Sequence, residues 1–189
     1  MVRSVAPLFA FAFFSAVPAI AAEPISLAPF RSVELEAGGD VSIVPGPVQR
    51  VTLVNGSREF TSFTIRRGDQ LVIGTSCDVR CPNRYNLRVQ IETPYVPDVA
   101  VKAGGSIIAA QGFAPQRQLS VAVDAGGTID VRAVEADEVS AAVNAGGDIY
   151  VRPRSALSAA VNAGGDIHYS GNPRVSMAVH DGGDVRRDY

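Results

Sequence analysis

The sequence predicts an all-β protein, a right-handed parallel β-helix (β-solenoid) with coils of about 18–22 residues. Three observations support this: a repeat of nearly constant length, alternating apolar residues inside it, and a Gly-Gly pair at one place in each copy. The copies read LSVAVDAGGT, VSAAVNAGGD, LSAAVNAGGD and VSMAVHDGGD and begin at residues 119, 139, 157 and 175. Their second glycines lie 20, 18 and 18 residues apart. Looser copies, VAVKAGGSI and VELEAGGDVSI, begin at residues 99 and 33.

Each repeat has the period-two pattern of a half-buried strand. In the first copy Leu119, Val121 and Val123 are apolar, and smaller or polar residues stand between them. The Gly-Gly pair that follows permits positive φ angles and therefore a tight corner. A second short strand follows each corner. The predicted corner glycines are Gly38, Gly39, Gly104, Gly105, Gly126, Gly127, Gly146, Gly147, Gly164, Gly165, Gly182 and Gly183.

One such unit cannot bury its apolar face alone, whereas stacked units bury it against each other. Equivalent strands would then pair in parallel, with a right-handed return. An antiparallel sandwich with Gly-Gly hairpins is the competing interpretation. The repeats favour the stack because residue types match column by column, as in Thr128, Asp148, Asp166 and Asp184. Whether a coil has two or three sides stays open.

The chain is predicted to hold one domain after a signal peptide. Residues 1–21 combine Arg3, an apolar run and an A-x-A cleavage site, so we expect export to the periplasm or the outside of the cell. No other long apolar segment occurs, and no transmembrane segment is expected in the mature chain. Residues 22–97 are predicted to form an irregular N-terminal β region with the first coils, and residues 98–189 the repeated coils.

The irregular region contains six candidate strands. We expect this region to begin the stack and to cover its first coil, because an open coil end is an exposed sheet edge. The candidates are residues 33–36, 41–44, 51–54, 60–65, 70–73 and 87–91.

Cys77 and Cys81 are the only cysteines. In an exported protein such a pair indicates a disulfide. Three intervening residues and no predicted helix speak against a redox pair, and a metal site would need further ligands. A structural disulfide is therefore predicted.

The most suggestive polar column contains Asp148, Asp166 and Asp184. Stacked coils would bring these carboxylates about 4.8 Å apart, where a cation such as Ca²⁺ could offset their repulsion. The alternative, which we favour, is that each carboxylate accepts hydrogen bonds from corner amides. We accordingly predict no metal and no cofactor, with these three residues as weak metal candidates.

Two further columns are expected to be structural or to form a surface. Asp124, Asn144, Asn162 and His180 precede the glycines and predict a polar ladder. The outward strand face carries only small side chains, which could rest on a partner or simply face solvent. Its residues are Ser120, Ala122, Ser140, Ala142, Ser158, Ala160, Ser176 and Ala178.

The sequence does not indicate an enzyme. No G-x-S-x-G, H-E-x-x-H or glycine-rich phosphate loop occurs, and His168 and His180 stand alone. The net charge of −2 does not suggest nucleic-acid binding. A β-helix polysaccharide lyase or hydrolase could use a carboxylate pair from Asp130, Asp148 or Asp166. A groove lined by Asp, Arg and Tyr would favour that alternative.

The A-G-G-D-I copies resemble the putative auto-transporter adhesin head GIN domain family, known from secreted bacterial proteins of unknown function. The resemblance is carried by VELEAGGDVSIVPG, by the segment at residues 71–73 and by the serial AGG copies, and would extend over residues 30–189. It implies a β-helix-like fold and a role in the envelope or outside the cell. It implies no catalytic residues.

Together these observations predict an exported, non-enzymatic, adhesin-like module that binds a cell-envelope component, a glycan or a protein. The alternatives are the polysaccharide-cleaving enzyme and a structural spacer stabilised by calcium.

Overall fold

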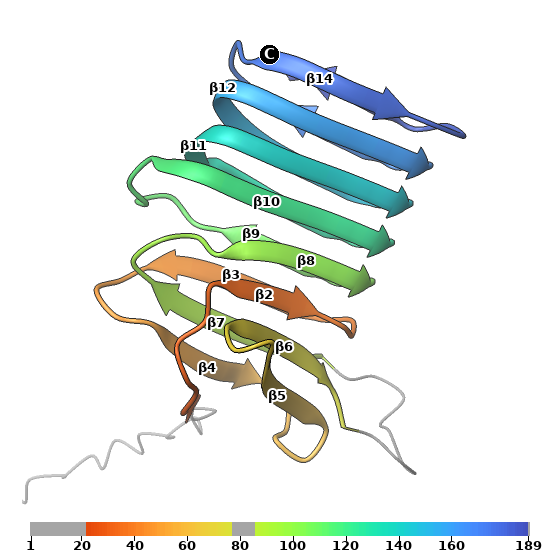
Figure 1. The fold of residues 1–189 in the computed structure, drawn as a ribbon. Helices are drawn as coiled ribbons and strands as arrows, with labels where there is room; N and C mark the ends of the chain where they lie inside the picture. The colour runs from red at the N-terminus through yellow and green to blue at the C-terminus, as the bar shows by residue number, and fades with distance from the viewer. Residues whose placement is uncertain (1–21, 77–85, 189) are drawn as a thin grey trace, which may run out of the picture.

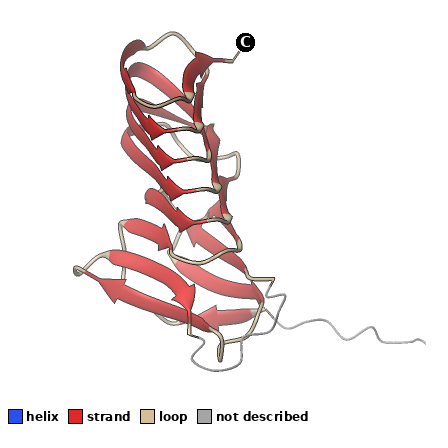
Figure 2. Ribbon diagram, turned by 90° about the vertical axis from the view of Figure 1, so that its right-hand side faces the viewer, coloured by secondary structure: helices blue, strands red, loops and turns tan. Residues whose placement is uncertain are grey.

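The computed structural model describes residues 22–76 and 86–188. All regular secondary structure in this part of the chain is β, and its fifteen strands form one strongly curled, mixed sheet (Figures 1 and 2). The prediction of an all-β protein is therefore confirmed. Within these residues no helix is long and apolar enough to cross a membrane. The predicted signal peptide (1–21) and the predicted Cys77–Cys81 disulfide lie outside the described residues.

The strands follow the candidates from the sequence closely in the N-terminal region and continue through every repeat. They are β1 (Glu23–Ile25), β2 (Ser32–Leu35), β3 (Asp40–Pro45), β4 (Arg50–Asn55), β5 (Thr61–Arg66), β6 (Gln70–Thr75), β7 (Arg88–Thr93), β8 (Asp98–Ala103), β9 (Ser106–Ala109), β10 (Gln116–Ala125), β11 (Thr128–Ala145), β12 (Asp148–Ala163), β13 (Asp166–Tyr169), β14 (Arg174–Val179) and β15 (Asp184–Arg187).

The strands lie in two rows. The first row runs β5-β6-β2-β8-β10, continues through the second halves of β11 and β12, and reaches β14. The second row runs β1-β4-β7-β3-β9, continues through the first halves of β11 and β12, and reaches β13 and β15. Because β11 and β12 each run from one Gly-Gly corner to the next, they belong to both rows (Figure 1).

The repeats pair in parallel and in register. Ile129 pairs with Ile107 on one side and with Ile149 on the other, and Ile149 pairs with Ile167. The sheet as a whole is mixed, however, because β1–β4, β4–β7 and β5–β6 are antiparallel. These antiparallel pairs all lie at the N-terminal end of the two rows, so the prediction of a purely parallel sheet is wrong there.

The order of strands in space also differs from their order in the sequence. Ser32 in β2 pairs with Gln70 in β6 and with Asp98 in β8, so β2 lies between two later strands. β3 likewise lies between β7 and β9. The N-terminal region was expected to begin the stack. Its strands do occupy that end of both rows, where β5 and β1 are outermost, but β2 and β3 are inserted between the later strands of this region and the repeats (Figure 1).

The corners explain why the repeats need paired glycines. Gly146 and Gly147 have φ angles of +74° and +102°. A Cβ on Gly146 would meet nothing within 4 Å, whereas a Cβ on Gly147 would lie 2.6 Å from the carbonyl oxygen of Gly127 below. The first glycine is thus required by the backbone angle alone, and the second also by close stacking. Among the predicted corner glycines only Gly38 lacks a positive φ.

The core is a set of apolar columns between the two rows. Val123, Val143 and Val161 form one column, and all three are fully buried. The isoleucines of the second row form another. Each side chain packs on its equivalent one repeat away, so burial depends on having a neighbour on both sides. The next member of the valine column, Val179 in β14, is 42% exposed.

Candidate functional site

The aspartate column forms where the second strand of each repeat begins. Asp148 pairs with Thr128 and with Asp166, and Asp166 pairs with Asp184. Asp148 and Asp166 are half-buried, whereas Asp184 is exposed. These aspartates follow the Gly-Gly corners directly, so the corner fixes where each carboxylate leaves the backbone.

The corner amides do not bond to these carboxylates. Gly126 N donates to Ala145 O at 3.2 Å, and Gly146 N donates to Ala163 O at 3.1 Å. The backbone N–H of Asp148 donates to Gly127 O at 3.0 Å. Among the described residues, no corner amide donates to the carboxylate of Asp148 or Asp166. The described hydrogen bonds therefore give no support to the interpretation that these side chains satisfy the corners.

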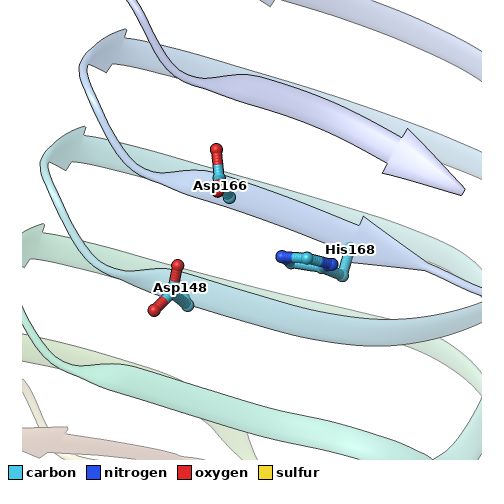
Figure 3. A group of neighbouring side chains, drawn as sticks. All are labelled: Asp148, Asp166 and His168. Carbon is cyan, nitrogen blue, oxygen red and sulfur yellow. The ribbon is translucent and has the colours of Figure 1, made fainter. Parts of the chain in front are cut away.

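His168 joins the two half-buried aspartates. It stands two residues after Asp166 on β13, and both side chains leave the same face of the strand. One potential metal-ligand atom from each of Asp148, Asp166 and His168 lies within 4.8 Å of the other two (Figure 3). The sequence suggested that His168 stands alone, and it suggested Asp184 as the third acid. The structure instead groups His168 with the acids and leaves Asp184 outside the group.

The imidazole of His168 is tightly held. Its side chain is 9% exposed, and its ring stacks on that of Tyr150 with centroids 4.5 Å apart and planes at 21°. Nδ1 lies 3.0 Å from Oδ1 of Asp188. Nη2 of Arg186 lies 3.1 Å from Nε2 and 3.6 Å from Oδ2 of Asp166. Burial, stacking and both ring nitrogens thus fix the orientation of this ring.

The guanidinium of Arg132 also lies over the ring of Tyr150. The guanidinium carbon of Arg132 is 4.4 Å from the centre of the Tyr150 ring. Arg132 also makes a bidentate pair with Asp130, at 3.0 Å for Nε and 2.7 Å for Nη2, and these hydrogen bonds raise the pKa of its guanidinium. Asp130, one of the carboxylates proposed for catalysis, is therefore committed to an ion pair. A small pocket of about 170 Å³ opens beside this group, and its lining includes Arg132, Tyr150, His168, Tyr169, Ser170 and Asp188.

The first row carries a different surface, which we call the Ser/Ala wall: Ser120, Ala122, Ser140, Ala142, Ser158 and Ala160. These six residues line a shallow groove of about 410 Å³. They lie on the outer face of β10, β11 and β12, in register from one strand to the next. Ser32, Gln70 and Asp98 lie at its N-terminal end. At that end Asp98 also accepts a hydrogen bond from the backbone of Ser120, at 2.8 Å.

The predicted polar ladder is present beside the wall. Asn144 donates to Asp124 and Asn162 donates to Asn144, each at 2.7 Å. Lys102 bonds to the other oxygen of Asp124. This hydrogen bond is the main reason why the pKa of Asp124 is lowered and that of Lys102 is raised. The ladder prediction is confirmed for these residues, while the fourth member, His180, is exposed and, within the described residues, makes no side-chain hydrogen bond to Asn162.

Some members of this arrangement were accessible from the sequence and others were not. The column Tyr150, His168 and Arg186 stands two residues after the column of aspartates in successive repeats. Aligning the repeats on the glycines would have placed His168 beside the aspartate column, between Tyr150 and Arg186. Asp188 could not be found in this way, because no other repeat has an equivalent acid at that place.

Comparison with known proteins supports the family suggested by the sequence. The model of the putative auto-transporter adhesin, head GIN domain, matches residues 98–173. No curated protein is significantly similar to the chain.

The solved structures that match this chain share little of its sequence. A putative adhesin from Bacteroides fragilis NCTC 9343 is 13% identical, with a TM-score of 0.44, over 89% of this chain and 96% of that one. A putative adhesin from Parabacteroides merdae ATCC 43184 is 13% identical, with a TM-score of 0.40, over 88% and 95%. A putative lipid binding protein from Parabacteroides distasonis ATCC 8503 is 12% identical, with a TM-score of 0.38, over 89% and 96%. At these TM-scores the likeness carries no conclusion about function.

The family predicted from the sequence is thus confirmed for the repeated segment, residues 98–173, which matches the putative auto-transporter adhesin, head GIN domain.

Proposed function

We propose that this chain is an exported, non-enzymatic, adhesin-like binding module of the bacterial cell envelope. The observation that carries the proposal is the Ser/Ala wall, a groove of about 410 Å³ that runs across three repeats. The family match adds support, since residues 98–173 resemble an adhesin head domain. The expected partner is an envelope component, a glycan or a protein.

We further infer that the repeats form a right-handed β-solenoid. Support comes from the in-register parallel pairing of β8, β10, β11, β12 and β14, since parallel strands need a crossover and such crossovers are overwhelmingly right-handed. The glycine spacings of 18 and 20 residues give each coil room for two short strands and a return. A solenoid would present the wall as a rigid surface whose length grows with the number of repeats.

The wall has properties that suit contact with an extended partner. Serine and alanine lose little side-chain entropy when they become buried, so ordering the wall on binding costs little. The wall residues carry no charge, so no charged group of the wall loses its hydration when a partner covers it. The hydroxyls of Ser120, Ser140 and Ser158 recur at the spacing of parallel strands, about 4.8 Å. A partner with polar groups along its length could bond to several of them together.

A polysaccharide-cleaving enzyme is the second candidate, because the pocket beside His168 contains the Arg, Tyr and Asp side chains expected for it. Two observations count against it. The pocket of about 170 Å³ is smaller than the roughly 300 Å³ at the lower end of small-molecule sites. Arg132 is also bound by Asp130 and covers one face of Tyr150, so neither side chain is free for a sugar.

Co-sedimentation tests both candidates in one experiment. Residues 22–189 are spun with isolated cell envelopes and with insoluble polysaccharides, and the supernatants are assayed for new reducing ends and unsaturated sugars. Pelleting without released sugar is the expected result. Released sugar would replace the binding module with the enzyme, and no pelleting on any material would count against a binding role.

A pair of variants locates the contact surface. Ser140→Glu places a charge on the exposed wall, and Ile108→Glu places the same charge on an exposed position of the other row. We expect Ser140→Glu to reduce the pelleted fraction severalfold and Ile108→Glu to leave it unchanged. Equal effects of the two variants would rule out the wall as the contact surface.

A further inference from the structure

We propose that Asp148, Asp166 and His168 bind a divalent cation of the zinc class. This site is independent of the wall, which lies on the other row of strands.

The backbone register creates the site. Asp148 and Asp166 pair across β12 and β13, and Tyr150 pairs with His168 in the same ladder. The ligand atoms of the three side chains lie within 4.8 Å of one another. Tetrahedral zinc with bonds of about 2.1 Å holds its ligands about 3.4 Å apart. Both aspartate side chains are only half-buried, so we expect their rotation to close that difference.

Asp188 prepares the histidine for this role. Its carboxylate lies 3.0 Å from Nδ1 of His168. In the proposed site this carboxylate accepts a hydrogen bond from Nδ1, which leaves the lone pair of Nε2 for the metal. Metal-bound histidines almost always donate their second ring nitrogen to a carboxylate or carbonyl in this way, which fixes the ring and makes it a better ligand. The ring is also buried and stacked on Tyr150, so little further ordering is needed when a metal binds.

The donor set decides which ion fits. One imidazole nitrogen with two carboxylate oxygens suits zinc and its neighbours in the transition series, whereas calcium and magnesium prefer oxygen ligands alone. The exposed side of the two aspartates leaves room for water as a fourth ligand. Calcium, which the aspartate column first suggested, is therefore the poorer candidate.

Arg186 competes with the metal. Its Nη2 lies 3.1 Å from Nε2 of His168 and 3.6 Å from Oδ2 of Asp166, and its Nε lies 3.3 Å from Nδ1, so it places positive charge beside two of the three ligands. Its side chain is 53% exposed and can turn towards solvent. Removing Arg186 should therefore strengthen metal binding, whereas removing any of the three ligands should weaken it. This opposite effect separates a metal site from a purely structural ion-pair network.

Titration calorimetry with Zn²⁺, and separately with Ca²⁺, tests the proposal. The untagged chain of residues 22–189 carries Cys77→Ser and Cys81→Ser, which remove the thiols as competing zinc ligands. We expect one Zn²⁺ per chain and no heat with Ca²⁺. In this background His168→Ala should weaken zinc binding at least tenfold, Arg186→Ala should strengthen it severalfold, and His180→Ala, the matched control, should leave it unchanged.

Three results would overturn the proposal: no zinc binding by the parent chain, zinc binding that survives His168→Ala, or weaker binding in Arg186→Ala. Circular dichroism checks that each variant is folded. Should His168→Ala fail to fold, Asp148→Asn replaces it, because this side chain is only half-buried and keeps its shape. Unchanged zinc affinity in Asp148→Asn would then contradict the site.

Discussion

The two ends of the described strand rows are built differently. At the N-terminal end β5 lies beside β6, and β4 and β1 lie beside β7, all in antiparallel pairs (Figure 1). Leu71 and Ile73 in β6 are fully buried there. At the other end β14 and β15 have a neighbour on one side only, and every residue of β14 is exposed.

The difference shows where the stability of a repeat comes from. Val161 and Val179 stand in the same column with the same strand geometry. Val161 is fully buried and Val179 is 42% exposed, because only Val161 has a repeat on both sides. Local sequence therefore forms the strand, but contact with neighbouring repeats supplies most of the burial. Matched substitutions in the two repeats measure that contribution directly.

A charge in the core column should give the largest contrast. Ala159→Glu places a carboxylate at a position that is 3% exposed, whereas Met177→Glu makes the equivalent change at a position that is 63% exposed. We expect Ala159→Glu to cost more than about 4 kcal/mol of unfolding free energy, enough to unfold many domains. Met177→Glu should stay within about 0.5 kcal/mol. Urea denaturation measures both, and similar losses would mean that the last repeat is covered in solution.

Replacing a glycine by alanine should destabilise the protein more at a stacked corner than in the hairpin at the N-terminal end of the rows. In Gly147→Ala the new methyl group would lie 2.6 Å from the carbonyl oxygen of Gly127, and the alanine backbone would have to adopt an unfavourable φ of +102°. In Gly68→Ala, in the β5–β6 hairpin, φ is +88° but nothing lies within 4 Å. We expect a loss of about 3 kcal/mol or more for the first and of about 1 kcal/mol for the second. Thermal melts compare the two variants. Equal losses of unfolding free energy would show that close stacking of the corners does not contribute to the need for glycine.

Shortening the valine column tests packing without charge or backbone strain. Val161→Ala removes two buried methyl groups and should cost about 2 kcal/mol, from lost burial and the cavity left behind. Val179→Ala removes half-exposed groups and should cost less than about 0.5 kcal/mol. A loss at Val179 as large as that at Val161 would contradict the one-sided packing of β14.

The polar ladder should give the smallest effect, and it depends on pH. Lys102 lowers the pKa of Asp124 below its usual 3.8, so the stability from this contact is present above that value and is lost as the pH falls below it. The pKa of Lys102 is raised above 10.5, so the same contact is also lost in strong alkali. Both side chains are about one-third exposed or more, which limits the contribution to at most about 1 kcal/mol.

Lys102→Met is the variant for this measurement. It should lower the unfolding free energy at pH 7 and reduce its further loss between pH 4 and pH 2, because Asp124 then titrates nearer its ordinary pKa. Denaturant melts at several pH values give both quantities. An unchanged acid profile in Lys102→Met would assign the acid sensitivity to other carboxylates.

Several features followed from the sequence because they depend on residues close together in the chain. The period-two pattern around Val121 and Val143 identified the strands and their buried face. The Gly-Gly pairs identified the corners, and equal spacing between them identified which residues become neighbours. The ladder from Asp124 to Asn162 follows from the same spacing. In a repeated sequence, equivalent positions of successive repeats pair with each other, so the pairing register can be predicted from the sequence.

The candidate metal site was only half accessible in this way. The column of Asp148 and Asp166 was found, because these residues recur. His168 was not assigned to it, since the imidazole occurs once and its position matters only through the strand next to it. Asp188 and Arg186, which belong to the following repeat, contact the ring nitrogens of His168.

The sequence by itself determined the all-β class, the parallel pairing of the repeats and the apolar columns, because regular spacing and alternation act through local geometry. Only the tertiary structure decided that β2 and β3 are inserted between later strands, that antiparallel strands close the N-terminal end, and that His168 meets two carboxylates. The first two features depend on contacts between segments without sequence similarity, and the third depends on a side chain that occurs in one repeat only. Such contacts are chosen by the burial and hydrogen bonding of the whole sheet, which no local pattern records.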